Sequence, residues 1–217
     1  MASHGAGTAR QDPADAPQQG PGGSLSRDTR LQTPGGMRRI SDLKVGDLVG
    51  TQDRGPQEIL WIGRTRLSRA ALAAAPWLCP VRIRRGALAP GLPRRDLIVA
   101  PLQRIALRDP AFLRRYRSAT VMLPALALVD GGAISTLPPN RGWTLYQLLL
   151  PHHALLLTEG CASESLAGEA ALRIGAELAI RIDGLPVVRN GLPRPAPSLG
   201  EARGLWRGRG RPDPEPG

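Results

Sequence analysis

The chain has 217 residues and a formal net charge of +11, from 29 Lys plus Arg against 18 Asp plus Glu. This length is enough for one sizeable core with tails, and its two cysteines exclude a disulfide-rich scaffold and match no metal-ligand spacing. Aromatic residues make up only 3% of the sequence, whereas Gly (26) and Pro (22) are frequent, so we expect short elements joined by many turns.

The positive charge comes almost entirely from arginine, because Lys44 is the only lysine. An arginine excess attracts nucleic acid or anionic surfaces, but together with abundant Ala, Gly and Pro it also fits a GC-rich coding sequence. The arginines are scattered along the sequence rather than gathered in one motif, which favours the second interpretation.

Residues 1–23 are rich in Gly, Pro, Ala, Gln and Asp and contain little to bury, so we expect a disordered N-terminal segment. The segment lacks the apolar run of a secretion signal, and no stretch of the chain is long and apolar enough to span a bilayer. We expect order to begin near Ser24, and the localisation stays open.

Elements typical of a β protein follow in chain order. TRLQT predicts a strand, and MRRISDLKVGD predicts a single helical turn closed by a tight turn at Gly46-Asp47. DLVGTQ and QEILWIGRTRL predict two strands of a meander. LSRAALAAAPWL predicts a short inserted helix that stops at Pro76.

The second half continues this pattern. PVRIRR alternates as a strand, Pro101 divides LIVAPLQRIAL into two strands with a sharp bend, and TVMLP predicts another strand. TLYQLLL and ALLLTEG predict two strands joined as a hairpin through Pro151-His152-His153. AGEAALRIGAEL predicts an amphipathic helix in an extension over 168–191, and 192–217 predicts a basic Pro/Gly-rich tail.

Four stretches in this order resemble the Hint (hedgehog/intein) domain, in the bacterial branch outside true inteins: DTRLQTPGGMRRISDLKVGDLV, GPQEILWIGR, VRIRRGALAPGLPRRDLIVAP and LYQLLLPHHALLLTEGCASES. The resemblance implies a Hint-like domain over 24–167. It also implies an all-β, horseshoe-like fold of short strands with pseudo-twofold halves, and short helices in insertions and after the domain. Active members cut the peptide bond before their first residue.

The resemblance places the nucleophile of this reaction at Ser24, where the family normally has Cys. The hydroxyl would attack the carbonyl of Gly23 and convert the amide into a more labile ester. A serine hydroxyl is far less acidic than a thiol, so it depends more strongly on a neighbouring base.

Other positions depart from the family. Its Ser-Pro-x-His-Arg stretch aligns with residues 100–104, so the hydroxyl position has become Ala100 and the histidine has become Gln103. A later family histidine is replaced by Gln147, whereas His153 matches. Gln103 can donate an amide N–H to an oxyanion but cannot shuttle a proton at neutral pH. These departures predict weak or no cleavage at Gly23–Ser24.

Each candidate also has a plain interpretation. Ser24 can be an ordinary loop or cap serine, and His153 a structural or exposed hairpin histidine. Cys79 and Cys161 are expected to be small buried hydrophobes. Two further residues, Glu159 and Glu164, are expected to serve caps, arginine pairing or solvent rather than catalysis.

Two functions therefore stay open. The first is a self-processing domain whose substrate is its own N-terminal segment, by an N-to-O acyl shift at Ser24 if it is active. The second is a non-catalytic basic module that holds a protein or nucleic-acid partner on the β scaffold. In LWRGRGRP, Trp206 and the arginines could grip RNA, with a solvated tail as the alternative. No motif implies a cofactor or a metal.

Overall fold

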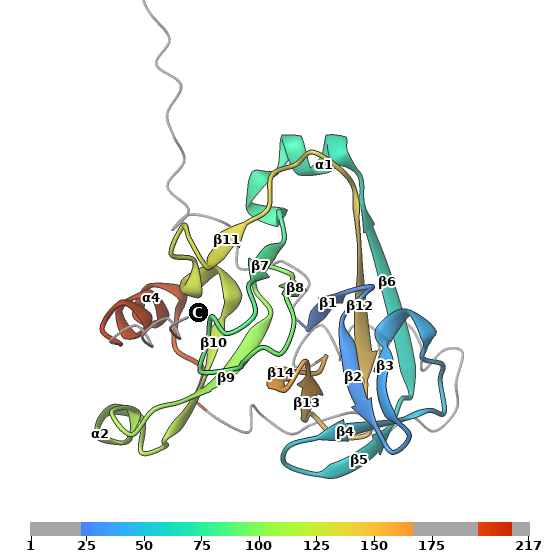
Figure 1. The fold of residues 1–217 in the computed structure, drawn as a ribbon, viewed down its shortest axis with the longest axis horizontal. Coiled ribbons are helices and arrows are strands. Elements are labelled where there is room, and N and C mark those ends of the chain that lie inside the picture. Colours follow the sequence, from blue (N-terminus) through green and yellow to red (C-terminus); the bar gives the residue numbers. More distant parts are fainter. Residues whose placement is uncertain (1–22, 167–194, 210–217) are drawn as a thin grey trace, which may run out of the picture.

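The computed structural model describes residues 23–166 and 195–209. Nearly all of the predicted N-terminal segment and the whole predicted extension over 168–191, with its helix, lie outside the described residues. Antiparallel strands dominate the described part and only short helices accompany them, so the expected all-β class is confirmed (Figure 1). None of the helices described is long and apolar enough to cross a membrane.

The first sheet has six antiparallel strands in the order β11-β7-β8-β1-β12-β6. β12 is its longest central strand, and it pairs with β1 on one side and with β6 on the other. In Figure 1 the β6–β12 ribbon reaches upward to the inserted helix α1. The strands are β1 (Ser24–Ser26), β6 (Trp61–Leu67), β7 (Val81–Ile83), β8 (Leu97–Val99), β11 (Ile134–Thr136) and β12 (Trp143–Leu149).

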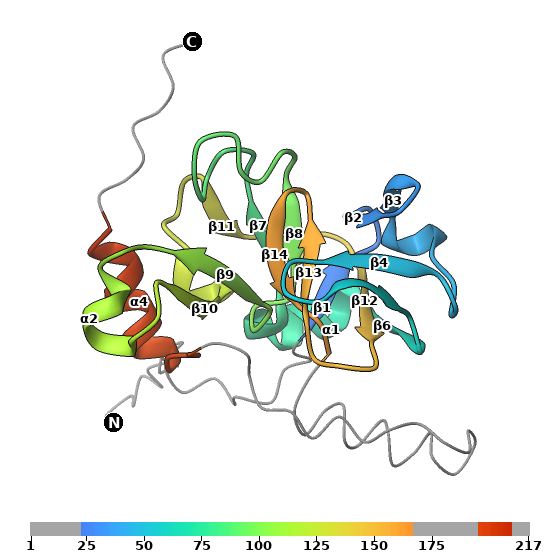
Figure 2. The ribbon, with the colours of Figure 1, turned by 90° about the horizontal axis from the view of Figure 1, so that it is seen from below.

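The second sheet follows the order β10-β9-β14-β13-β2-β3, and the β4–β5 hairpin joins it through β13. Figure 2 shows β13 and β14 beside one another near the middle of the molecule. The strands are β2 (Arg30–Thr33), β3 (Gly36–Arg39), β4 (Leu48–Thr51), β5 (Gly55–Glu58), β9 (Arg104–Arg108), β10 (Thr120–Pro124), β13 (Leu155–Thr158) and β14 (Cys161–Glu164).

Short helices connect the strands. α1 (Arg69–Ala74) is the helix predicted before Pro76, and its N-terminus is capped by the Ser68 hydroxyl, which accepts a hydrogen bond from the Ala71 N–H. α2 (Phe112–Tyr116) lies between β9 and β10. The others are α4 (Leu199–Arg207) and the 3₁₀ turns η2 (Ile40–Asp42), η3 (Pro76–Leu78) and η4 (Ala125–Leu128).

The turn predicted around Gly46-Asp47 is present. The Asp47 carboxylate accepts hydrogen bonds from the Lys44 N–H (2.9 Å) and from the Arg38 guanidinium (3.1 Å), and Gly46 has φ +91. Ile40 and Leu43 are buried on the core side of this turn. The segment therefore works as a corner that returns the chain toward the core.

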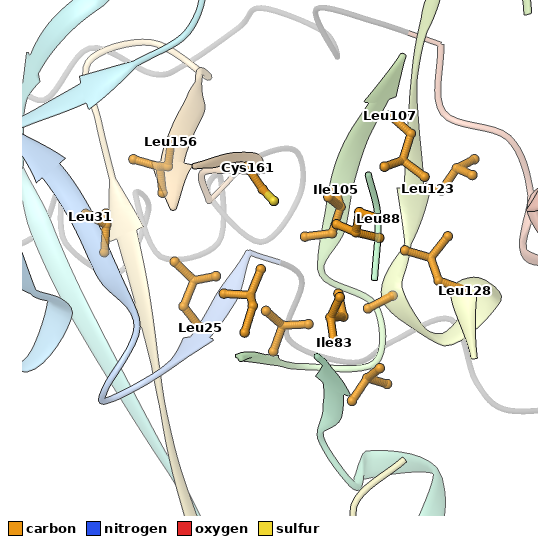
Figure 3. Close-up of a cluster of buried hydrophobic side chains, with 14 of the residues drawn as sticks. Leu25, Leu31, Ile83, Leu88, Ile105, Leu107, Leu123, Leu128, Leu156 and Cys161 are labelled. Atoms are coloured by element: carbon orange, nitrogen blue, oxygen red, sulfur yellow. The ribbon is translucent and has the colours of Figure 1, made fainter. Parts of the chain in front are cut away.

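Aliphatic side chains fill the space between the two sheets. Figure 3 shows Leu25 and Ile83 from the first sheet facing Ile105, Leu123 and Leu156 from the second. All five belong to one buried cluster. Short branched side chains from many strands thus build the core that a sequence poor in aromatic residues predicts.

The chain crosses from one sheet to the other at three bends that matter for the site. Residues 59–60 lead from β5 to β6, residues 100–103 lead from β8 to β9, and residues 150–154 lead from β12 to β13. The bend at Pro101, predicted from the sequence, is therefore a change of sheet. At each crossing, the chain passes from one sheet to the other through buried residues.

One pairing expected from the sequence is wrong, and one expected strand is divided. β12 and β13 do not form a hairpin, because β12 pairs with β1 and β6 while β13 pairs with β14, β2 and β4. His153 and Ala154 are buried in the crossing between the sheets instead of exposed at a hairpin tip. The strand expected over QEILWIGRTRL divides into β5 and β6 in different sheets, because Ile59 enters the core at the crossing. The expected meander pairing is present between β4 and β5.

The segment expected to be a solvated tail contains α4, which packs on β10 and η4. The helix starts with a capping box between Ser198 and Glu201, and Ala202 is fully buried. The pKa of the Glu201 carboxyl is lowered, chiefly because the Ser198 backbone N–H donates to it. Trp206 packs against the core and Arg209 lies over its ring, so this tryptophan is not a free stacking platform.

Opposite changes within α4 test this packing. Ala202→Leu should lower the free energy of unfolding by about 1–3 kcal/mol, because the added atoms overpack a closed site. Gly204→Ala in the same helix should raise the free energy of unfolding by about 0.5–1 kcal/mol, because alanine favours a helix more than glycine does. The added Cβ meets no atom within 4 Å. Urea unfolding of both variants and wild type measures the two effects. A neutral Ala202→Leu would contradict the packed position of α4.

Candidate functional site

Ser24 opens the first described strand, between two neighbours of the same sheet. Its carbonyl accepts a hydrogen bond from the Ala100 N–H (3.0 Å), and the register places it opposite Gln147 on β12. The next residue, Leu25, is anchored in the core, so the side chain of Ser24 points to the other face of the sheet. Ser24 is fully buried, which makes it part of the sheet rather than a loop serine.

The residue before the candidate nucleophile fits only as glycine. Gly23 has φ +73, a conformation that side chains disfavour. A Cβ on Gly23 would lie 3.0 Å from the Cα of Leu166 and 3.2 Å from the carbonyl oxygen of Ser165. Leu166 itself is held by a hydrogen bond from its N–H to the Leu148 carbonyl (3.0 Å). The Gly23–Ser24 peptide therefore lies close to the backbone of Ser165 and Leu166.

Gln103 lies at the crossing from β8 to β9 and is fully buried. Its backbone N–H donates to the Ala100 carbonyl (3.0 Å), which closes the bend. Its side-chain Nε2 donates to the Arg104 carbonyl (3.1 Å) and to the Glu164 carbonyl (3.0 Å). Its Oε1 has no hydrogen-bond partner among the described residues. Gln103 thus ties β9 to the end of β14.

His153 lies at the crossing from β12 to β13, with 2% of its surface exposed. Nε2 lies 3.2 Å from Oε1 of Glu164, close enough for an ion pair but outside hydrogen-bond geometry. Nδ1 has no hydrogen-bond partner in the described part of the chain. The Glu164 carboxylate also lies 3.4 Å from Nη1 of Arg104.

Glu164 is the residue that connects the candidates. Its carbonyl accepts from Gln103, its carboxylate faces His153, and Arg104 pairs with it from the other side. Ser24 joins this group through backbone, because Ala100 hydrogen-bonds to both Ser24 and Gln103. The structure therefore brings Gln103 and His153 to one carboxyl residue, with Ser24 at the adjoining bend.

Glu164 is not among the residues that the sequence predicts at the site, although the sequence contains a signal for it. In CASESL, Ala162 and Leu166 share the face of Glu164, and both are buried. A charged residue between two apolar ones on one strand face needs buried partners. The expected arginine pairing is present with Arg104, but exposure to solvent is wrong, because Glu164 is 3% exposed.

The other buried glutamate of the β13–β14 hairpin is structural. Glu159 is buried, has φ +47 and accepts a hydrogen bond from the Arg30 N–H (3.0 Å). It lies beside Cys161, whose pKa is raised to about 12, first by burial and second by the Glu159 charge. Both cysteines are free and buried. Over residues 23–166 and 195–209, no three His, Cys, Asp or Glu side chains come together in a way that could hold a metal ion.

Comparison with known proteins agrees with this architecture. A family model described as the Hint domain matches residues 24–170. The domain is thus of the self-processing Hint type. The chain belongs to the Hint domain family, whose model covers most of its length. No curated protein matches the sequence.

Solved inteins show limited similarity. A variant of the gp41-1 intein is 18% identical, with a TM-score of 0.41, and the match covers 65% of this chain and 98% of that one. A variant of the MchDnaB-1 intein is 13% identical, also with a TM-score of 0.41, and the match covers 66% of this chain and 99% of the intein.

The raised pKa of Cys161 predicts a thiol that is inert in the folded protein. At pH 8 the thiolate fraction should be about a thousandfold smaller than for a thiol at the ordinary 9.0, because the pKa is raised to about 12. In a Cys79→Ser variant, iodoacetamide should label Cys161 only after unfolding, as measured by intact mass. Labelling of the native protein at the rate of a free thiol would contradict the burial.

Proposed function

We propose that this Hint domain is self-processing in architecture, with weak or no cleavage of its Gly23–Ser24 bond. In the reaction, Oγ of Ser24 attacks the carbonyl carbon of Gly23, the new C–O bond replaces the C–N bond, and the freed nitrogen of Ser24 takes up a proton. Residues 1–23 would then be held as an ester. The reaction needs a nucleophile, stabilisation of the oxyanion and a proton donor for the nitrogen.

The nucleophile and the bond it attacks favour retention of the self-processing architecture. Ser24 is buried in the sheet, and the acyl residue before it is a glycine held against Ser165 and Leu166. A glycine carbonyl offers the least hindrance to an attacking hydroxyl. His153 and Glu164 lie at the neighbouring crossing as a buried imidazole and carboxylate.

The observation that carries the loss of activity is the bonding of Gln103. A side-chain amide has two N–H donors, and Nε2 of Gln103 uses them on the Arg104 and Glu164 carbonyls. No N–H is left for an oxyanion, and an amide cannot supply a proton at neutral pH. Ala100, at the family's hydroxyl position, has no polar side-chain atom. The proton donor of the reaction is therefore missing at this bend.

Intact mass tests cleavage directly. We expect wild type and Ser24→Ala to stay whole, before and after hydroxylamine, which cleaves an ester but spares an amide. The double variant Ala100→Ser/Gln103→His should release residues 1–23 at least about 100-fold faster than wild type, because a restored general acid contributes that much. Adding Ser24→Ala to the double variant is the control and should abolish release. Complete trimming of wild type, absent in Ser24→Ala, would overturn the proposed loss.

A second function, the binding of an anionic partner, is favoured by the charge distribution. No Asp or Glu occurs in any of the six strands of the first sheet. Residues 59–95 contain eight arginines and no acidic residue. Arg64 and Arg66 are exposed on β6, the edge strand, and alternation places them on one side of it. The six strands of the first sheet and the segment 59–95 thus carry arginines without acidic residues, which favours a nucleic-acid or acidic protein partner.

Salt-dependent binding of single-stranded DNA tests this second function. Removing two phosphate contacts with Arg64→Ala/Arg66→Ala should lower the slope of log affinity against log salt by about 1.4. Arg114→Ala/Arg117→Ala, which removes two exposed arginines in and just after α2, is the matched control and should keep the slope. A salt-independent affinity, or no affinity at low salt, would rule out the nucleic-acid form of the proposal.

A further inference from the structure

Glu164 is a buried carboxylate between a guanidinium and an imidazole. It ends β14 with 3% exposure, and its carboxylate lies 3.2 Å from Nε2 of His153 and 3.4 Å from Nη1 of Arg104. Burying a carboxylate is costly unless charge and hydrogen bonds compensate it. Arg104 opens β9 directly after the crossing at 100–103, and His153 lies in the crossing at 150–154, so the compensation connects the two crossings of the site.

The two partners of Glu164 differ in their contact with water. The Arg104 side chain is 38% exposed, whereas the His153 side chain is 1% exposed. Arg104 is permanently charged, so it compensates the carboxylate from the solvent side without any help from the histidine.

The carboxylate then determines which ring nitrogen carries the proton. A neutral imidazole has one N–H donor and one acceptor, and an ionised carboxylate only accepts. Nε2 lies 3.2 Å from the Glu164 carboxylate, and although this contact falls outside hydrogen-bond geometry, the negative charge favours the proton on Nε2, which leaves the lone pair on Nδ1. Nδ1 is buried and has no hydrogen-bond partner among the described residues. A carboxylate behind one imidazole nitrogen, with the other left as acceptor, is the arrangement of a general base.

The same strand end reaches the bond to be cut. The residues after Glu164 are Ser165, whose Oγ accepts from the Ala154 N–H (3.1 Å), and Leu166, which packs against Gly23. The carbonyl of Glu164 also receives the Gln103 side chain. Glu164 is thus tied to His153, to Gln103 and, through the next two residues, to the Gly23–Ser24 peptide.

From these contacts we infer that Glu164 is a positioning residue of the self-processing site, which orients His153 with its Nδ1 lone pair available as proton acceptor. This inference rests on the proposed function. In the step it serves, the Ser24 hydroxyl gives its proton to Nδ1 as the C–O bond forms, and the departing nitrogen of Ser24 takes its proton from a separate donor as the C–N bond breaks, the donor that Gln103→His restores. Glu164 itself touches no reacting atom.

The protonation of His153 tests the inference without any cleavage. In ¹⁵N-resolved NMR spectra of the wild-type chain, assigned with His153→Gln, Nε2 should show the shift of a protonated nitrogen and Nδ1 that of an unprotonated one. Glu164→Gln should move both shifts to intermediate values, because an amide can donate as well as accept. Glu159→Gln, which changes another buried glutamate of the same turn, should leave them unchanged. Protonated Nδ1 in wild type, or unchanged shifts in Glu164→Gln, overturns the inference.

Cleavage in the Ala100→Ser/Gln103→His background separates this inference from the proposed function. Adding Glu164→Gln should slow release of residues 1–23 by at least about tenfold, and Glu164→Asp, which keeps the charge, should recover part of the rate. An equal rate in folded Glu164→Gln overturns the positioning role. If the background variant does not cleave at all, the proposed function fails, while the NMR result still decides the Glu164–His153 arrangement. If Glu164→Gln does not fold, Glu164→Asp provides the comparison, and an unprotonated Nε2 in that variant overturns the inference.

Discussion

The structure depends on one constraint: the chain must cross between the two sheets without exposing the aliphatic core. With few aromatic side chains, no single strand buries enough apolar area, so many short strands must share one aliphatic core. Most residues of the crossings at 100–103 and 150–154 are therefore buried, although His152 is exposed, and the buried backbone polar groups must find partners inside the protein. Gln103 and His153 occupy these crossings, which explains why a site can form there from strands far apart in the sequence.

Polar residues at the crossings serve structure and chemistry with the same atoms. The N–H groups of Gln103 satisfy two buried carbonyls, which stabilises the bend but removes them from any reaction. The Glu164 carboxylate is in the opposite situation. The neighbours that compensate its burial are the same groups through which it would act at the site. The proposed loss of activity at one crossing and the presence of an imidazole and carboxylate pair at the other can thus coexist in one stable fold.

Local sequence patterns predict most strands, the α1 helix and the Gly46-Asp47 turn, because those features depend on neighbouring residues. They fail where partners come from far away. The segment around His153 was predicted as a hairpin because two strands flanked it, yet both strands pair elsewhere. Glu164 was underestimated because its value depends on Arg104 and His153, which only the fold brings near. The α4 helix was missed because its Gly- and Arg-rich composition hides one buried alanine.

The glycine before Ser24 has a consequence for anyone who attaches a foreign protein upstream of this domain. The left-handed backbone of Gly23 and its close approach to Leu166 are requirements of folding, independent of any bond cleavage. A fusion partner that ends in a bulky residue at this junction would push the first strand away from its neighbours before chemistry could begin. The domain therefore requires glycine as the last residue of any protein fused directly before Ser24.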